Sequence, residues 1–540
     1  ISTVCGVGAT TSLTDVPVRD VSMQSPLLER IDQAASRFGS QPAIFSDNGT
    51  LTHQEVKILS SRVAASLAAR GVTKGDRIAL YAHNGPEFVV LYLGIVRAGA
   101  TVVPVNLLIN TPEIAHVLGD SGASGVLVQH SLLSRIQAAV AMSGISPFLV
   151  EIGETEQALD NLASLLTETS PPPIIDYTPV QDLVAILYTS GTTGFPKGAM
   201  LTHRNLAANT ESVHLAMHWR AGLDRVLVVL PMFHAFAATV GLLTPLTNGS
   251  ALIPLSRFEP DGVSTAIHRF EATIFLGVPS MYAVLLRLAP DKVALFQSLR
   301  FGVSGGAAMP LKVLEDFETK FNFKVYEGDG PTECSPVTCV NPIGGQQKPG
   351  TVGLPVPGVE MRIVDEAGGA CPDGIVGEIA VRGDNVMRGY WNQPDATAEV
   401  MRDGWLLTGD LGTRDADGYF SIVDRKKDLI IVNGMNVYPR MIEEVIHAIS
   451  SVREVAVIGE PDGLHGEIPV AYLACDPDAQ LDETSLRLHC RKFLGRHQVP
   501  KRFIFMAALP RNAAGKILKR ELRLDGERER GITAATLLER

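Results

Sequence analysis

The stretch Tyr188-Thr-Ser-Gly-Thr-Thr-Gly-Phe-Pro-Lys-Gly198 decides how the fold of this chain is interpreted. It follows the apolar run Leu183-Val-Ala-Ile-Leu187, which predicts a buried strand. Its glycines let backbone N–H groups approach phosphate oxygens, and its serine and threonines add hydroxyl donors. Its lysine is followed by glycine, where a Walker A loop has Ser or Thr. The stretch therefore predicts an anion-binding loop of another kind, with a surface turn as the alternative.

A second segment, Arg511-Asn-Ala-Ala-Gly-Lys516, carries a lysine on a loop that its glycine makes flexible. A lysine in this setting can swing into a site and neutralise negative charge that develops during a reaction. An ordinary surface lysine is the alternative. Together the two segments predict phosphate chemistry that a mobile lysine completes.

Composition limits the class of protein. A net charge of −11 argues against a dedicated nucleic-acid-binding protein, which would carry a basic surface. The six cysteines show no CxxC spacing, so we expect free thiols in a reducing cytoplasm.

Residues 1–24 lack the pattern of a signal peptide and predict a disordered leader. Prolines interrupt the uncharged span 226–256, so we expect no integral membrane segment. Peripheral contact with a membrane and a homodimer stay open.

The pattern of elements changes along the chain. Residues 25–423 alternate helical periodicity with short apolar strands, which predicts an α/β domain of mostly parallel sheets covered by helices. Within it, residues 354–382 predict a small β-rich subdomain. From residue 424 onward, Asn433-Gly434 predicts a tight hairpin turn and Pro439 the start of a helix. We therefore expect residues 424–540 to form a small α+β domain.

Several motifs occur in an order that is typical of one superfamily: the loop at 188–198, His234, Thr332-Glu333, Thr408-Gly-Asp410, Asp424-Arg-Lys-Lys427 and Gly515-Lys516. The chain resembles the adenylate-forming enzymes, which include acyl-CoA synthetases, adenylation domains of peptide synthetases and luciferases. The resemblance covers nearly the whole chain, and the stretch Asp424 to Pro439 is most similar to bacterial fatty-acid–CoA ligases.

The resemblance implies an ATP- and Mg²⁺-dependent acyl-CoA synthetase. Such an enzyme would join a medium- or long-chain fatty acid to AMP, release pyrophosphate, and transfer the acyl group to coenzyme A. Residues 424–540 would form a mobile lid that turns on a hinge at Lys427. Gly434 would then approach the pantetheine arm of coenzyme A.

The resemblance also assigns residues to the site. Lys516 would bridge the carboxylate and the α-phosphate, and His234 would separate the acyl tunnel from the thiol entrance. Glu333, assisted by Thr192, would hold Mg²⁺. The nucleotide would contact Thr189, Ser190, Gly191, Thr192, Thr193, Gly194, Lys197, Gly305, Gly306, Ala307, Glu327, Gly328, Asp329, Thr332, Asp410, Arg425 and Lys516. For an apolar acyl pocket the candidates are Phe233, Phe236, Val240, Val278, Met281 and Tyr282, for which ordinary core packing is the alternative.

The sequence departs from the superfamily at one position. Gly328-Asp329-Gly330 has an aspartate where related enzymes have an aromatic residue that stacks on adenine. Base affinity or selectivity is therefore expected to differ. Ile431 replaces the second lysine of luciferase-like enzymes, which speaks against light-emitting oxidation.

Three other functions remain open at the level of sequence. A fatty acyl-AMP ligase would load a carrier protein, but it carries an insertion for which residues 353–383 are too compact. A ligase for aryl or branched acids would use the same machinery. A catalytically inactive lipid-binding protein would bind nucleotide without releasing pyrophosphate.

Overall fold

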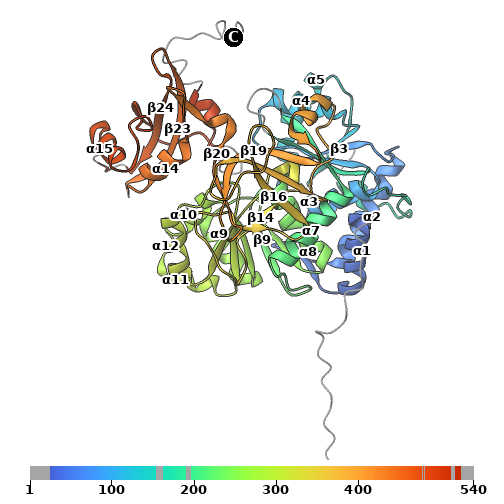
Figure 1. The fold of residues 1–540 in the computed structure, drawn as a ribbon. Coiled ribbons are helices and arrows are strands. Elements are labelled where there is room, and N and C mark those ends of the chain that lie inside the picture. Colours follow the sequence, from blue (N-terminus) through green and yellow to red (C-terminus); the bar gives the residue numbers. More distant parts are fainter. Residues whose placement is uncertain are drawn as a thin grey trace, which may run out of the picture.

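The computed structural model describes residues 25–153, 162–189, 196–449, 451–476, 478–479, 481–511 and 517–523. Two large sheets with covering helices make up most of the molecule, and two smaller sheets follow toward the C-terminus (Figure 1). Ser190, Gly191, Thr192, Thr193, Gly194 and Lys516, which the sequence assigns to the site, lie outside the described residues.

A six-stranded sheet carries the strand that precedes the predicted anion-binding loop. Its order is β6-β5-β3-β4-β7-β8, and only β8 runs antiparallel to its neighbour. The strands β3, β4 and β5 are almost wholly buried, as expected for parallel strands covered on both faces. The bounds are β3 Arg77–Tyr81, β4 Thr101–Pro104, β5 Gly125–Gln129, β6 Phe148–Ile152, β7 Leu183–Thr189 and β8 Lys197–Thr202.

A nine-stranded sheet has the order β15-β14-β13-β12-β11-β9-β10-β1-β2. Its central strands β13, β12, β11, β9, β10 and β1 are parallel, and the strands at both edges are antiparallel. The bounds are β1 Pro42–Ser46, β2 Gly49–Thr52, β9 Arg225–Val228, β10 Ala251–Pro254, β11 Ile274–Gly277, β12 Phe301–Ser304, β13 Lys324–Asp329, β14 Cys339–Val340 and β15 Leu354–Pro355.

Helices cover both faces of these two sheets. The largest apolar core joins the inner faces of the sheets through α2, α3, α7 and the π-helix η2. A second core packs α9, α10 and α12 on the other face of the nine-stranded sheet, and a third packs α4 and α5 on the other face of the six-stranded sheet. The bounds are α1 Leu27–Phe38, α2 His53–Ala69, α3 Pro86–Arg97, α4 Thr111–Ser121, α5 Leu133–Ser143, α6 Leu162–Leu166, α7 His203–Ala216, η2 Ala237–Leu243, α8 Thr244–Asn248, α9 Pro260–Phe270, α10 Pro279–Leu285, α11 Pro290–Val293 and α12 Leu311–Phe321.

The two smaller sheets follow in sequence order. The first has the order β16-β17-β19-β18 with β20 beside β19. Its first two strands coincide with the β-rich subdomain predicted at 354–382, and the sheet continues beyond that range to Arg425. The second has the order β22-β21-β24-β23 with β25 beside β24, and it packs against α14 and α15 (Figure 1). The bounds are β16 Val359–Val364, β17 Gly377–Gly383, α13 Pro394–Val400, β18 Met401–Arg402, β19 Trp405–Arg414, β20 Phe420–Arg425, β21 Ile430–Val432, β22 Met435–Val437, α14 Pro439–His447, β23 Val452–Asp462, β24 Gly466–Cys475, α15 Glu483–Phe493 and β25 Arg502–Phe505.

The α/β fold class that the sequence predicts is confirmed, including the hairpin at Asn433-Gly434 and the helix that begins at Pro439. Predicted element ends are off by up to two residues: the run 183–187, expected to be a buried strand, belongs to β7, Leu183–Thr189. Among the residues that the structure describes, none of the helices has the length and apolar character needed to cross a membrane.

Candidate active site

The ends of the predicted anion-binding loop are held in register. Thr189 is the last residue of β7, Lys197 is the first residue of β8, and the two are direct partners in the antiparallel pair. The Thr189 hydroxyl donates to the Lys197 carbonyl oxygen at 3.4 Å. The loop thus connects two paired strands instead of opening a helix, which agrees with its difference from a Walker A loop.

Helix α4 anchors both strands of this loop. The Tyr188 hydroxyl donates to Oδ2 of Asp120 at 2.6 Å, and Nε2 of His116 lies 3.2 Å from the Pro196 carbonyl oxygen. The helix itself is held by a capping box in which Asn110 and Glu113 each accept from the backbone of the other. A cap of this kind is worth about 1 kcal/mol. The sequence reasoning did not identify this support.

Glu333, the candidate metal ligand, is half-buried in the 3₁₀ turn η4, Thr332–Cys334, directly after β13. Its backbone carbonyl accepts from the Met387 N–H at 2.7 Å. Its side-chain Oε1 accepts from the Tyr390 hydroxyl, also at 2.7 Å. The segment between β17 and α13 therefore fixes both the backbone and the carboxylate of this residue.

Tyr390 was missed by the sequence reasoning. Its ring centroid lies 5.2 Å from Nζ of Lys197, so one side chain contacts two residues that were assigned to the site separately. No local pattern around Tyr390 indicates this role, because the contacts join segments that are distant in the sequence.

Two glycine-rich segments end neighbouring parallel strands. Gly305, Gly306 and Ala307 follow β12, and Gly328 and Asp329 end β13. Gly330 has no space for a side chain, since a Cβ there would lie 1.6 Å from the Pro336 carbonyl oxygen. The carboxyl ends of parallel strands are where ligands bind in α/β sheets.

Glu327 is 5% exposed and accepts a hydrogen bond from the Met309 backbone N–H at 3.0 Å. Burial raises the pKa of Glu327 to about 7, although the Met309 hydrogen bond and the charge of Arg440 oppose this shift. Its neighbour Asp329 accepts at its backbone oxygen from the N–H and hydroxyl of Thr338, both at 3.0 Å. Glu327 and Asp329 thus place two carboxyl groups at the C-terminal end of β13.

Asp410 and Arg425 are direct partners on β19 and β20. Nε of Arg425 lies 2.6 Å from Oδ1 of Asp410, which is 4% exposed. Burial lowers the pKa of Arg425, but the charges of Asp410, Asp329 and Glu333 raise it by more. Arg425 thus lies in the field of three carboxylates that the sequence assigned to the nucleotide and metal positions.

Of the residues assigned to the acyl pocket, Phe236 and Val278 border the glycine segment after β12, whereas Tyr282 packs in the core. A Cβ placed on Gly305 would lie 3.3 Å from the Phe236 ring, and one on Gly306 would lie 3.8 Å from Val278, so these two side chains border the glycine segment. Tyr282 is fully buried and its hydroxyl donates to the Val303 carbonyl oxygen at 2.9 Å, which supports core packing for this residue. His234 is exposed, and its Nδ1 accepts from the Phe236 N–H at 3.4 Å.

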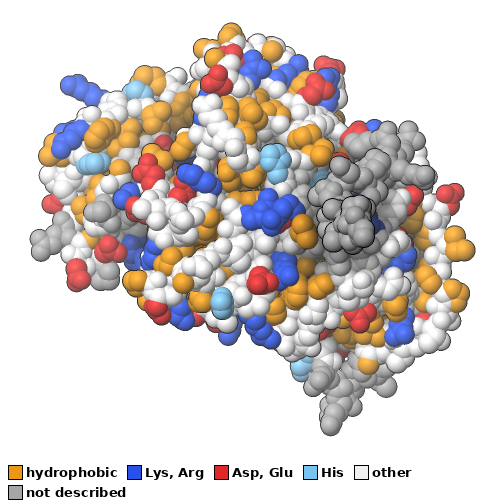
Figure 2. Space-filling view, turned by 90° about the horizontal axis from the view of Figure 1, so that it is seen from below, with side chains coloured by type: hydrophobic (Ala, Val, Ile, Leu, Met, Phe, Trp, Pro, Cys, Tyr) orange, Lys and Arg blue, Asp and Glu red, His pale blue; other side chains and the backbone are white. Residues whose placement is uncertain are grey.

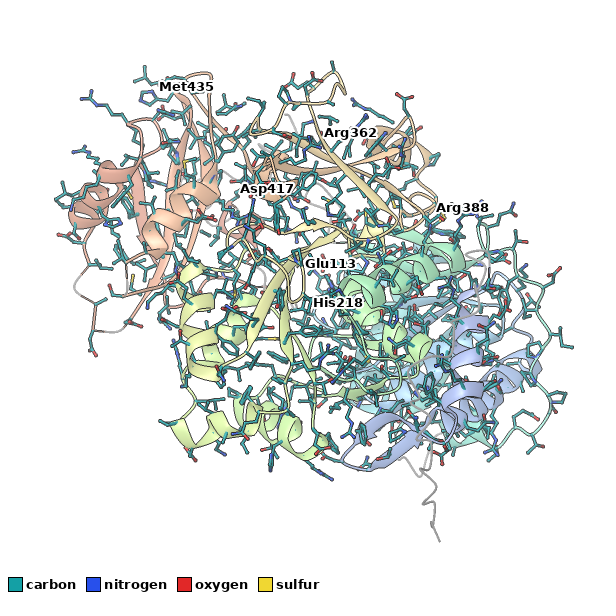
Figure 3. All side chains as sticks on the ribbon, turned by 60° about the horizontal axis from the view of Figure 1, so that its bottom comes forward. Glu113, His218, Arg362, Arg388, Asp417 and Met435 are labelled. Atoms are coloured by element: carbon teal, nitrogen blue, oxygen red, sulfur yellow. The ribbon has the colours of Figure 1, made fainter. Side chains whose placement is uncertain are left out.

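The C-terminal sheet joins the rest of the molecule through a short 3₁₀ turn, η5, Lys426–Asp428, which contains Lys427. Gly434 is exposed in the hairpin between β21 and β22, and Met435 marks the outer end of that hairpin (Figure 3). A cavity of about 310 Å³ lies beside the turn and is lined by Lys427, Asp428, Leu429, Gly459, Glu460, Pro461, Glu467 and Arg523.

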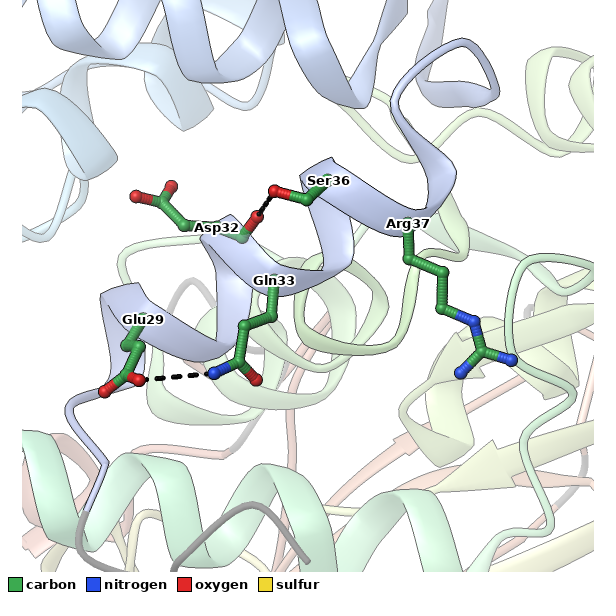
Figure 4. Close-up of a pocket in the computed structure, with 5 residues that line it drawn as sticks. All are labelled: Glu29, Asp32, Gln33, Ser36 and Arg37. Carbon is green, nitrogen blue, oxygen red and sulfur yellow. Dashed lines mark hydrogen bonds between the residues drawn. The ribbon is translucent and has the colours of Figure 1, made fainter. Parts of the chain in front are cut away.

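A second hollow lies on helix α1 and is lined by none of the candidate site residues. It is open and has a volume of about 500 Å³, and in it Gln33 donates to Glu29 at 3.2 Å and the Ser36 hydroxyl to the Asp32 carbonyl at 2.8 Å (Figure 4). All five residues that line it belong to α1. Among the described atoms of the face in Figure 2, acidic and basic side chains are interspersed.

A family model described as AMP-binding enzyme matches residues 31–391, and a second, described as AMP-binding enzyme C-terminal domain, matches residues 441–516. The chain therefore belongs to the AMP-binding enzyme family, the adenylate-forming enzymes that its motifs resemble.

Three known proteins show the range of this likeness. A long-chain-fatty-acid–CoA ligase from Yersinia pestis is 37% identical over 553 residues, which cover 96% of this chain and 98% of that protein. A feruloyl-CoA synthase from an Amycolatopsis species is 37% identical over 476 residues, which cover 88% and 93%. The crystal structure of ATP-bound MatB from Rhodopseudomonas palustris aligns with a TM-score of 0.85 at 33% identity and covers 93% of this chain and 99% of that one.

The donor groups fit a magnesium–nucleotide complex. Within the described residues, no cluster of three or more His, Cys, Asp or Glu side chains provides a complete protein cage for a metal. Mg²⁺ commonly uses one or two carboxylates together with substrate phosphates, and Glu333 supplies such a carboxylate. Lys197 contacts the same tyrosine, Tyr390, and Asp410 carries a second carboxylate, paired with Arg425.

Proposed function

We propose that this protein is an acyl-CoA synthetase for medium- or long-chain fatty acids and acts in the cytoplasm. It uses ATP and Mg²⁺ to form an acyl adenylate, transfers the acyl group to coenzyme A, and releases AMP and pyrophosphate. The observation that carries this proposal is a set of contacts between segments that are distant in the sequence. Tyr390 contacts both Lys197 and Glu333, and Arg425 pairs with Asp410 in the field of Glu333.

Each residue has a role in the first half-reaction. The fatty-acid carboxylate attacks the α-phosphate, the new C–O–P linkage forms, and pyrophosphate leaves. Thr189, Lys197 and the intervening loop bind the β- and γ-phosphates, while Asp410 accepts from the ribose hydroxyls. Glu327 accepts from the exocyclic amine of adenine. Glu333 would hold Mg²⁺, which would supply charge neutralisation when bound, and Lys516 supplies the remaining positive charge at the reacting centre.

The second half-reaction requires the thiol of coenzyme A to reach the acyl carbon. We assign residues 25–423 to the large domain and residues 424–540 to the lid, with the pivot at Lys427. Turning the lid removes Lys516 from the path of the thiol and brings Gly434 toward it. A short turn such as η5 is a suitable pivot, because a few residues can absorb the whole change in backbone dihedral angles.

The acid class is the part of the proposal that needs the most direct test. The relatives include a ligase named for long-chain fatty acids and a synthase named for a ferulic-acid product, at the same identity. The longer coverage of the first favours the fatty acid. A pyrophosphate-release panel across fatty and aryl acids, with and without coenzyme A, decides between them. Release from aryl acids alone would overturn the fatty-acid assignment, and adenylate that coenzyme A does not discharge would favour loading of a carrier protein.

Lys516→Ala separates the two half-reactions. We expect it to abolish pyrophosphate release from acid and ATP, because the cation at the α-phosphate is lost. Thioester formation from a supplied acyl adenylate should continue. Both rates are measured on the same preparation, and equal loss of the two would contradict the role assigned to Lys516.

A further inference from the structure

Tyr390 is held rigidly beside the candidate metal position. It lies in the segment between β17 and α13, forms an isolated bridge with Ala199 of β8, and is 9% exposed. Its backbone N–H donates to Oγ1 of Thr397 at 2.8 Å. Because backbone and ring are both fixed, the hydroxyl points in a defined direction.

That direction is toward Glu333. The hydroxyl donates to Oε1 at 2.7 Å, while Met387 of the same segment donates to the Glu333 carbonyl oxygen at 2.7 Å. A carboxylate has two oxygens with about four acceptor positions. One donor on Oε1 therefore orients the group and leaves Oε2 available to a cation.

The same ring also faces Lys197, whose Nζ lies 5.2 Å from its centroid. A lysine over a tyrosine face gains cation–π attraction, which restricts where the ammonium group moves. Lys197 begins β8 of the six-stranded sheet and Glu333 lies in η4, after β13 of the nine-stranded sheet, and Tyr390 contacts both.

We propose that Tyr390 is a positioning residue that orients the Glu333 carboxylate toward Mg²⁺ and holds Lys197 beside it. This inference rests on the proposed function. Groups that orient a metal ligand typically change metal affinity by about 10- to 100-fold when removed.

Tyr390→Phe tests the hydroxyl while keeping the ring that faces Lys197. The measurement is equilibrium binding of a non-hydrolysable ATP analogue, without fatty acid, across a Mg²⁺ titration. We expect the Mg²⁺ concentration for half-maximal enhancement to rise about tenfold. Binding of the analogue without metal should stay at the wild-type value.

Tyr419→Phe is the matched control. Tyr419 is 5% exposed, its hydroxyl donates at 2.7 Å, and Nζ of Lys348 lies 4.4 Å from its ring centroid. Its acceptor, however, is the Gln346 backbone oxygen, and Lys348 pairs with Asp415 and Asp417, outside the candidate site. This variant should leave the Mg²⁺ titration unchanged.

Glu333→Gln separates failure of the inference from failure of the proposed function. If it flattens the Mg²⁺ titration and Tyr390→Phe shifts it, with no further effect in the double variant, the inference is supported. If Glu333→Gln flattens the titration but Tyr390→Phe matches wild type, the inference is overturned and the proposed function stands. Equal weakening with and without metal in Tyr390→Phe also overturns it, since that indicates general structural damage. Absence of acid-dependent pyrophosphate release from wild type overturns the proposed function.

Discussion

At the scale of single residues, Glu327 is the clearest case of a carboxyl group whose ionisation the fold disfavours. It is buried at the end of β13, where desolvation raises its pKa to about 7. The unfolded chain ionises this carboxyl near its ordinary value, so folding becomes less favourable as the pH rises from about 4.5 through 7. A residue that weakens the fold in this way is often retained for function.

Glu327→Gln should therefore stabilise the protein at pH 8 more than at pH 5. The amide retains an oxygen for the Met309 N–H and has no charge to desolvate. The difference between the two pH values is expected to be about 2 kcal/mol in the free energy of unfolding, measured by denaturant titration. Glu360→Gln is the control. The hydrogen bond from Arg382 lowers the pKa of this exposed carboxyl, so it is largely ionised in both the folded and the unfolded chain from pH 5 upward, and the effect of the substitution should be nearly the same at the two pH values. If the effect of Glu327→Gln on stability does not change with pH, the raised pKa of Glu327 in the folded protein is contradicted.

At the scale of elements, two hairpins have nearly the same turn and different expected roles. Asn433 and Gly434 join β21 to β22 with φ values of 51° and 76°. Asp403 and Gly404 join β18 to β19 with φ values of 50° and 78°. A Cβ on either glycine would meet nothing within 4 Å. The two turns therefore provide the same backbone strain at two places in the molecule.

Gly434→Leu and Gly404→Leu should each destabilise the fold by about 1 kcal/mol, since a left-handed conformation costs an L-residue this much. Only Gly434→Leu should slow thioester formation from a supplied adenylate, because the new side chain obstructs the pantetheine arm. Thermal unfolding and the coenzyme A-dependent rate measure the two effects. A similar slowing in both variants would argue against a role for Gly434 near coenzyme A.

At the scale of the whole molecule, polar contacts among the described residues join the start of the C-terminal unit to the sheet that precedes it. In α14, the Arg440 backbone N–H donates to Oδ2 of Asp424 at 2.8 Å, and Nη1 of its side chain donates to the Ile422 carbonyl oxygen at 2.6 Å. Nζ of Lys426 lies 2.9 Å from Oε2 of Glu378 on β17. Polar contacts of this kind at a junction between domains are compatible with a unit that changes orientation.

Lys427→Pro should slow thioester formation more than adenylation, because proline removes one free dihedral angle at the proposed pivot. Lys427→Ala is the control, since it removes the side chain and leaves the backbone free. The readout is the ratio of the two half-reaction rates. The same ratio in wild type and both variants would place the pivot elsewhere.

Local patterns in the sequence were enough for the fold class, the strand before the loop, the Asn-Gly hairpin and the helix at Pro439. These features depend on the periodicity and backbone preferences of neighbouring residues. The order of motifs was also enough to identify the family, since each motif can be recognised without its surroundings.

Tertiary structure alone decided which side chains meet. The Tyr390–Glu333 contact joins positions 57 residues apart, and the Tyr188–Asp120 contact joins positions 68 residues apart. It also decided that Tyr282 packs in the core and that Glu327 is buried. Contacts of this kind depend on how sheets and helices pack against each other, and no property of the separate segments specifies that packing.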